Sequence, residues 1–124
     1  MADEVLVYIN KHRTEMGLPK LQMDERISEI AEKHSRNMAN DNIPFGHSGY
    51  DDRMKAISKK TDHITATAEN VALGDVDAKE VVKMWLDSKM HRKNIEGNYN
   101  LTGVGIAKDK NGALYFTQIF VLNK

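Results

Sequence analysis

Residues Leu101–Leu122 read LTGVGIAKDKNGALYFTQIFVL and give the clearest indication of the architecture. Two runs rich in β-branched and aromatic residues, Leu101–Ala107 and Leu114–Leu122, predict strands. The Asn-Gly pair at 111–112 is a strong turn signal between two such runs. We therefore expect the chain to end in an antiparallel β-hairpin.

Helical patterns come first along the chain. Apolar residues of Glu4–Met16 fall on one helical face, and Gly17 is suited to end that helix in a left-handed conformation. Asp24 is a favoured N-cap for a second helix, which we expect to reach about Asn40. A short third helix is predicted over Asp51–Ser58.

The middle of the chain predicts a strand and then another helix. Ile64–Leu73 has the character of an extended segment, and Asp77–Glu80 resembles a capping box. The helix that the box opens would place Trp85 and Ser88 on one face, with His91 in its final turn or just past it.

Together these elements predict an α+β fold over residues 1–124, a single domain. Helices precede and follow short strands, so we expect helices to cover both faces of a small, mainly antiparallel sheet. Gly103 and Gly105, in the first hairpin strand, would permit close backbone packing or a bulge.

The composition of the chain argues against nucleic-acid binding and against a membrane-spanning segment. The chain has 124 residues, with 18 lysine plus arginine against 18 aspartate plus glutamate. This formal neutrality disfavours nucleic-acid binding, which needs an excess of positive charge. No apolar run approaches the roughly 18 residues of a membrane span, so no transmembrane segment is expected.

The sequence leaves the cellular compartment open. There is no cysteine, so disulfides cannot stabilise the domain, although exported bacterial proteins often lack them too. The start Met1–Glu4 has neither the basic nor the apolar character of a signal peptide. Either the protein is cytosolic or the chain is a mature fragment.

The candidate site consists of His47, Glu69 and His91, separated by two gaps of 22 residues each. Only a fold that brings distant segments together can unite them. Two imidazoles and a carboxylate in one cleft can bind a divalent metal or move a proton. The alternative is that both histidines are ordinary polar contacts. Glu69 is either a general base acting on metal-bound water or the partner that fixes an imidazole tautomer.

The residues also resemble the CAP superfamily of cysteine-rich secretory proteins, antigen 5 and plant pathogenesis-related proteins. The resemblance spans nearly the whole chain, in the family's motif order. The matching segments are Asn10-x-x-Arg13 with Gly17-Leu18-Pro19, Gly46-His47 with Arg53, Ala68-Glu69-Asn70-Val71, Trp85-x-x-Ser88-x-x-His91-x-x-Asn94, and Gly103-Val104-Gly105 with Tyr115–Phe120.

This resemblance implies a three-layer α-β-α sandwich with a wide cleft. It also implies a cleft tetrad of two histidines and two acids, which binds zinc or similar ions in several members. His47, Glu69 and His91 carry over, whereas Ser88 stands where many eukaryotic members have the second acid. In lacking the second acid and a cysteine-containing tail, the chain resembles the bacterial branch of the family more than the animal or plant branches.

Four further residues are predicted to line the cleft: Asn70, Ser88, Tyr115 and Gln118. Trp85 is expected in the core because of its spacing with Val81. His12 and His34 are expected to be satisfied core residues.

Two functions follow as hypotheses. The first is a secreted, periplasmic or cell-surface binding module that weakly holds a divalent metal, such as zinc, through His47 and His91. Its ligand would be a lipid or sterol, a cell-wall component or a protein. The second is a metal-assisted, peptidase-like hydrolase with Glu69 as the general base.

Overall fold

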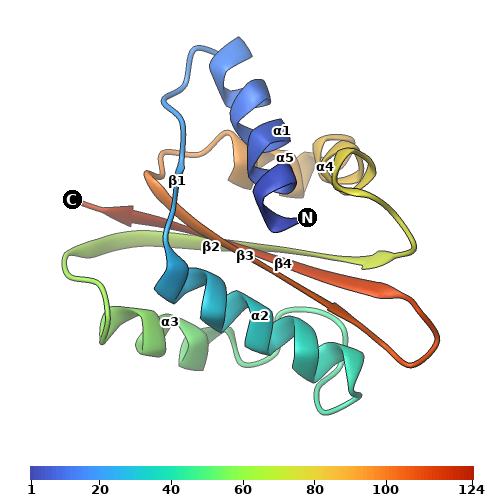
Figure 1. The fold of residues 1–124 in the computed structure, drawn as a ribbon. Coiled ribbons are helices and arrows are strands. Elements are labelled where there is room, and N and C mark those ends of the chain that lie inside the picture. Colours follow the sequence, from blue (N-terminus) through green and yellow to red (C-terminus); the bar gives the residue numbers. More distant parts are fainter.

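The computed structural model describes residues 1–124, and it has three layers. One face of a four-stranded sheet is covered by helices α1, α4 and α5, and the other by α2 and α3 (Figure 1). The elements in chain order are α1 (Ala2–Glu15), β1 (Gln22–Met23), α2 (Glu25–Ala39), α3 (Tyr50–Ser58), β2 (Ile64–Gly74), α4 (Ala78–Leu86), α5 (Lys89–Ile95), β3 (Leu101–Lys108) and β4 (Leu114–Asn123). The predicted α+β class and the α-β-α layering are confirmed.

The sheet has the order β1-β3-β4-β2. The predicted hairpin forms β3 and β4, and β2 pairs antiparallel with the other side of β4. Only β1 is parallel to its neighbour, through Gln22 opposite Leu101 and Met23 opposite Thr102. The sheet is therefore mainly antiparallel, as expected, and β2 lies at its edge.

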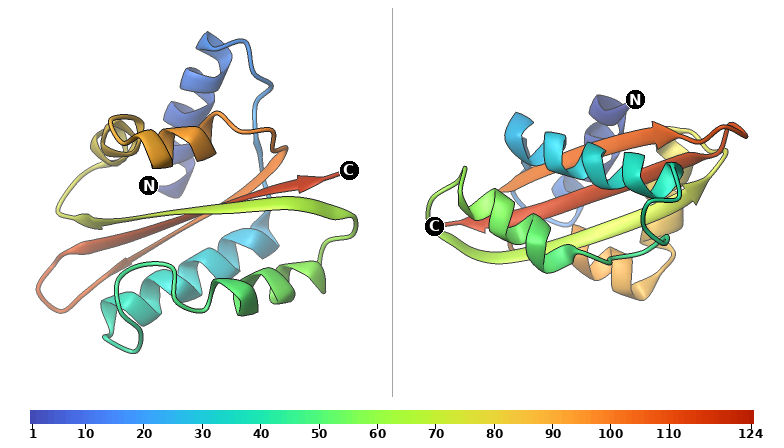
Figure 2. Two further views of the ribbon diagram at one scale, coloured as in Figure 1. Left: turned by 180° about the vertical axis from the view of Figure 1, so that it is seen from behind. Right: turned by 90° about the horizontal axis from the view of Figure 1, so that it is seen from below.

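Apolar side chains on both faces of β4 hold the layers together. Phe116 and Phe120 pack with Trp85 against α1 and α4, whereas Ile119 and Val121 belong to a smaller cluster under α2. This division follows from the alternation of side chains along a strand. The views from behind and below show the same two helical layers on opposite sides of the strands (Figure 2).

Capping residues in the sequence determine where several helices begin or end. The Asp24 side chain accepts hydrogen bonds from the amides of Arg26 and Ile27 and so caps α2. Asp77 and Glu80 form the predicted capping box of α4. Gly17, with φ +75°, follows α1 in the predicted left-handed conformation.

One predicted element is wrong in detail. The helix that begins after Asp77 does not include Ser88, which was expected on the same helical face as Trp85: it ends at Leu86, and a separate helix, α5, starts after Ser88. Ser88 has an extended backbone, with φ −105° and ψ 121°, and serves as the N-cap residue of α5. Serine is common at such a position, but here its hydroxyl lies 2.8 Å from Nδ1 of His91 and does not accept from the amides of α5. His91 therefore lies in α5, not at the end of the helix that carries Trp85.

Close packing, rather than a bulge, explains the two glycines of β3. A Cβ atom at Gly105 would collide with the backbone nitrogen of Glu32, and one at Gly103 would collide with that of Ser28. Both clashes are with the backbone of α2, which cannot yield as a flexible side chain can. α2 therefore lies directly on β3.

We predict that Gly105→Ala destabilises the protein by at least about 3 kcal/mol, because α2 must move off the sheet. Gly74→Ala is the matched control, since its Cβ would lie 3.6 Å from Val76 in ordinary contact. Urea unfolding followed by circular dichroism measures both. Equal midpoints for the two variants would contradict the close approach of α2 to β3.

Candidate functional site

The two histidines line one cleft of about 640 Å³. The loop before α3 contributes His47, and α5 contributes His91. The floor comes from the C-terminal part of β2 and from the end of α4, and six of the ten lining residues are apolar. The fold thus brings His47 and His91 together, as the sequence predicted. The residues that line the cleft are Phe45, Gly46, His47, Val71, Ala72, Leu73, Met84, Trp85, Ser88 and His91.

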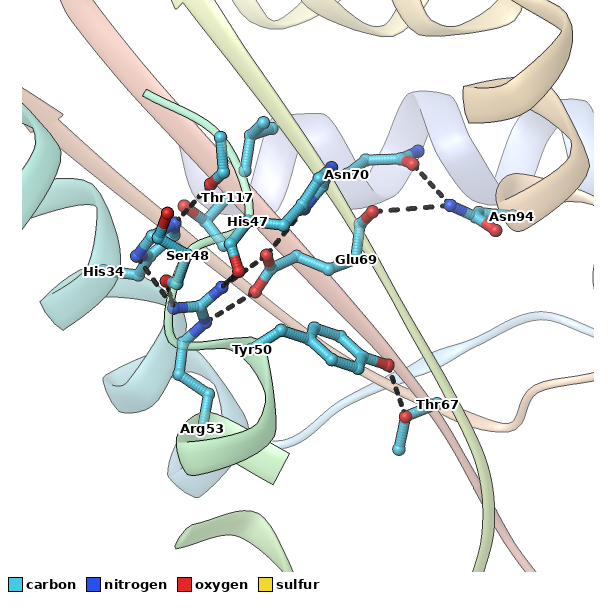
Figure 3. A network of polar contacts seen from close by, with 12 residues as sticks. His34, His47, Ser48, Tyr50, Arg53, Thr67, Glu69, Asn70, Asn94 and Thr117 are labelled. Carbon is cyan, nitrogen blue, oxygen red and sulfur yellow. Dashed lines mark hydrogen bonds and ion pairs between the residues drawn. The ribbon is translucent and has the colours of Figure 1, made fainter. Parts of the chain in front are cut away.

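Glu69 lies behind His47 and is buried, with its side chain 1% exposed. Its carboxylate forms a two-pronged ion pair with Arg53, whose Nε and one terminal nitrogen each lie 2.7 Å from a different oxygen. The same carboxylate also accepts from Nδ1 of His47 at 2.8 Å (Figure 3). Both oxygens of Glu69 are therefore engaged by neighbouring side chains.

This contact determines the tautomer of His47. A carboxylate paired with arginine can only accept, so Nδ1 of His47 carries the hydrogen. Nε2 of the neutral ring then has a free lone pair, and it makes no hydrogen bond within the protein. The His47 side chain is 51% exposed, so that nitrogen is accessible to a ligand.

His91 is oriented in a similar way from the other side of the cleft. Its Nδ1 lies 2.8 Å from the Ser88 hydroxyl, and its backbone carbonyl accepts from the Asn70 side chain at 3.1 Å. Asn94 in turn donates to Asn70 Oδ1 at 2.8 Å. Burial, with a smaller contribution from the nearby His47, lowers the pKa of His91, which favours its neutral, ligating form.

A buried arginine fixes α5 itself. Arg13 of α1 donates from one terminal nitrogen to the carbonyls of Ile95 and Gly97, both at 2.8 Å, and from Nε to that of Pro19 at 2.8 Å. Because the first two acceptors lie at and just beyond the end of α5, the guanidinium anchors the helix that carries His91.

The other arginine anchors the loop that carries His47. Besides Glu69, Arg53 donates to the carbonyls of His47 and Ser48 and to Nδ1 of His34. These contacts engage all five N–H groups of the guanidinium. The sequence analysis named Arg53 only as part of a motif and gave it no role. No local pattern in the sequence indicates that this arginine of a short helix would pair with Glu69.

Two residues predicted to line the cleft lie elsewhere. Gln118 is fully buried in the sheet, and its side chain donates to the Thr102 hydroxyl at 3.0 Å. Tyr115 lines a separate depression beside the hairpin turn, and its ring centroid is 6.5 Å from that of Phe45. Strand alternation could not reveal this, because it gives the face of a side chain but not what covers that face.

The remaining predicted residues are placed as follows. Ser88 lines the cleft, and Asn70 is buried behind it, bonded to the backbone of α5. Trp85 is buried, and its indole nitrogen donates to the Val71 carbonyl at 3.1 Å. Sequence reasoning missed the apolar rim, namely Phe45, Leu73 and Met84, which are exposed at the mouth.

Metal-binding groups in the chain are sparse. No group of three or more histidine, cysteine, aspartate or glutamate side chains is arranged to hold a metal ion. The donor set at the cleft is thus limited to two imidazoles. No helix combines the length and apolar character that crossing a membrane requires.

We predict that Glu69→Gln destabilises the protein by about 3–5 kcal/mol, because it leaves the Arg53 charge buried without a counter-ion. Glu96→Gln is the control: Glu96 pairs with His12, its side chain is 27% exposed, and its loss should remove less than about 1 kcal/mol. Denaturant unfolding of both variants measures the difference. A loss for Glu69→Gln no larger than that for Glu96→Gln would show that the buried pair is not needed.

Stability should also fall in mild acid. Burial chiefly, with the charge of Arg53 adding to it, lowers the pKa of His34 in the folded protein, although its bond to Gly46 opposes the shift. As pH falls below about 6.5, the unfolded chain takes up a proton that folded His34 resists, so folding is disfavoured. This stabilisation is complete above that pH and declines toward the folded-state pKa.

We therefore predict a lower melting temperature at pH 5.5 than at pH 7.5, with a shallower decline in His34→Gln. Scanning calorimetry at several pH values measures the melting temperatures of both proteins. A melting temperature that is constant or rises over this interval would contradict the assignment.

Comparisons with known proteins agree with the geometry. The model of the cysteine-rich secretory protein family, CAP, matches residues 6–120. The "Uncharacterized protein YkwD" of Bacillus subtilis is 37% identical over 125 residues, which cover 95% of this chain and 46% of that protein. The chain thus spans less than half the length of that relative.

Solved structures share the fold. One is an extracellular protein containing an SCP domain from Bacillus anthracis, with a TM-score of 0.83 and 26% identity over 98% of this chain and 40% of that one. Another is an outer surface protein from Borrelia burgdorferi, with a TM-score of 0.80 and 21% identity over 97% and 90% of the two chains. The chain belongs to the cysteine-rich secretory protein (CAP) family.

Proposed function

We propose that this domain is a secreted or cell-surface binding module whose cleft holds a divalent metal ion, such as zinc, between His47 and His91. The observation that carries the proposal is that both rings line one cleft and that each is held by a hydrogen bond at Nδ1. Each ring is bonded at Nδ1, His47 to Glu69 and His91 to Ser88, and the Nε2 atom of neither ring has a hydrogen-bond partner within the protein. Imidazoles oriented in this way by a second contact are typical metal ligands.

The donor set fits a weakly held ion. Two neutral imidazoles suit zinc and related borderline metals, and solvent or a ligand would complete the coordination. Structural zinc sites have four protein ligands, so two ligands predict exchangeable binding. The bound ion would supply a Lewis-acidic centre, while Glu69 and Ser88 keep the rings in place.

The bonding of Glu69 favours a binding role over hydrolysis. A general base needs a carboxylate that reaches the reacting water, but this one is buried and paired on both oxygens. Its contacts instead match the role of fixing an imidazole tautomer. The peptidase-like alternative would require Glu69 to leave Arg53 during turnover.

The cleft lining indicates the character of the ligand. Phe45, Leu73 and Met84 are exposed at the mouth, where an apolar group of a lipid, a cell-wall component or a protein would cover them. An extracellular setting is supported by the relatives, which include an extracellular protein and an outer surface protein.

Zinc titration by calorimetry tests the proposal. Wild type should bind zinc, each single variant, His47→Ala or His91→Ala, should bind at least about 10-fold more weakly, and the double variant should not bind. His63→Ala is the control, because His63 is exposed and lies outside the cleft. Identical titrations for wild type and the double variant would refute the metal site.

A peptidase assay of wild type and Glu69→Gln, with and without zinc, separates binding from hydrolysis. Peptidase activity that depends on zinc and disappears in Glu69→Gln, while that variant stays folded, would favour the hydrolase instead.

A further inference from the structure

We propose that His34 is a positioning residue for His47, acting through the backbone of the loop and through Arg53. Of the measurements below, only the zinc titration rests on the proposed function. The hydrogen bonds of His34 do not depend on whether a metal binds. His34 lies on α2 and is 2% exposed, so it does not reach a ligand in the cleft. Its ring nevertheless contacts Arg53, which in turn binds Glu69 beside His47 (Figure 3).

The tautomer of His34 follows from its partners. Arg53 can only donate, so Nδ1 of His34, 3.1 Å from a terminal nitrogen of Arg53, must accept. The ring hydrogen then lies on Nε2, which donates to the carbonyl of Gly46 at 2.7 Å. Both ring nitrogens of His34 are thus hydrogen-bonded, one to Arg53 and the other to the loop.

The two residues divide the loop carbonyls between them. Gly46, His47 and Ser48 are consecutive, and their carbonyls accept from His34, Arg53 and Arg53 respectively. The same Arg53 also holds Glu69, which accepts from the His47 ring. The backbone and the side chain of His47 are therefore both fixed by one connected set of hydrogen bonds.

The loop needs such anchoring because its backbone is unusual. Gly46 has φ +139° and Gly49 has φ +81°, conformations that glycine permits but does not prefer over others. The exposed Phe45 and His47 contribute little burial in this segment. Fixed donors from α2 and α3 therefore select one arrangement of the loop.

The neighbouring Ser35 shows what a purely structural contact on α2 looks like. Its hydroxyl is buried and donates to the Gly105 carbonyl at 2.9 Å, and it lies 2.8 Å from the Thr117 hydroxyl. These partners belong to β3 and β4, and neither is a residue of the loop. Ser35→Ala therefore removes buried hydrogen bonds from the same helix without touching the loop.

The test compares His34→Leu, His34→Gln and Ser35→Ala with wild type in zinc-free buffer and then in a zinc titration. For His34→Leu we expect the ¹⁵N shifts of the His47 ring to lose their single-tautomer pattern. Exchange of the Tyr50 amide, which donates to the His47 carbonyl at 3.0 Å and so reports on the loop, should rise about 10-fold, and zinc affinity should fall about 10-fold. His34→Gln keeps a donor and an acceptor and should recover part of each effect.

Ser35→Ala should lower the melting temperature yet leave the tautomer, the loop exchange and the zinc affinity at wild-type values. The proposal is overturned if His34→Leu keeps wild-type loop exchange and tautomer, or if Ser35→Ala changes them as much. If His34→Leu does not fold, the contrast between His34→Gln and Ser35→Ala decides by the same criteria. Absence of zinc binding by wild type would refute the metal site, whereas the zinc-free measurements would still decide the role of His34.

Discussion

The buried ion pair between Arg53 and Glu69 is the interaction on which the cleft depends. It joins α3 to β2, and through its remaining hydrogen bonds it reaches α2 and the loop before α3. Burying two charges yields little net stability, because their desolvation offsets most of the attraction. What the pair provides is geometry: five donors in one plane fix the positions of several oxygen and nitrogen atoms at once.

β2 is the strand from which both histidines are oriented. Glu69 and Asn70 are adjacent, so their side chains leave opposite faces of the sheet. Glu69 holds His47 from the face covered by α2 and α3, and Asn70 holds the backbone at His91 on the face covered by α5. One dipeptide thus sets the relative placement of two side chains that are far apart in the sequence. Arg13 completes this arrangement, because it fixes the end of α5 independently of β2.

The sequence was sufficient to predict those elements that depend on residues close together in the chain. The hairpin, the capping box and the Asp24 cap depend on neighbouring residues, and the structure contains all of them. β1 escaped notice because two residues show no periodicity, and it exists only by pairing with β3. The break between α4 and α5 was missed because the helical spacing of Trp85, Ser88 and His91 continues across it. At the site, residue types and motif order identified the histidines and Glu69, whereas the partners of Arg53 and His34 are properties of tertiary packing alone.

The edges of the sheet have a consequence for how the molecule behaves in concentrated solution. An exposed edge strand offers unpaired carbonyls and amides to a strand of another copy, which leads to aggregation. On β2 the carbonyls of Glu69 and Val71 already accept from Asn94 and Trp85, so two acceptors that an incoming strand would need are occupied. The opposite edge strand is β1, which is only two residues long and pairs with Leu101 and Thr102 of β3. Trp85 of the cleft lining and Asn94 of α5 thus also hinder the pairing of β2 with a strand of another copy.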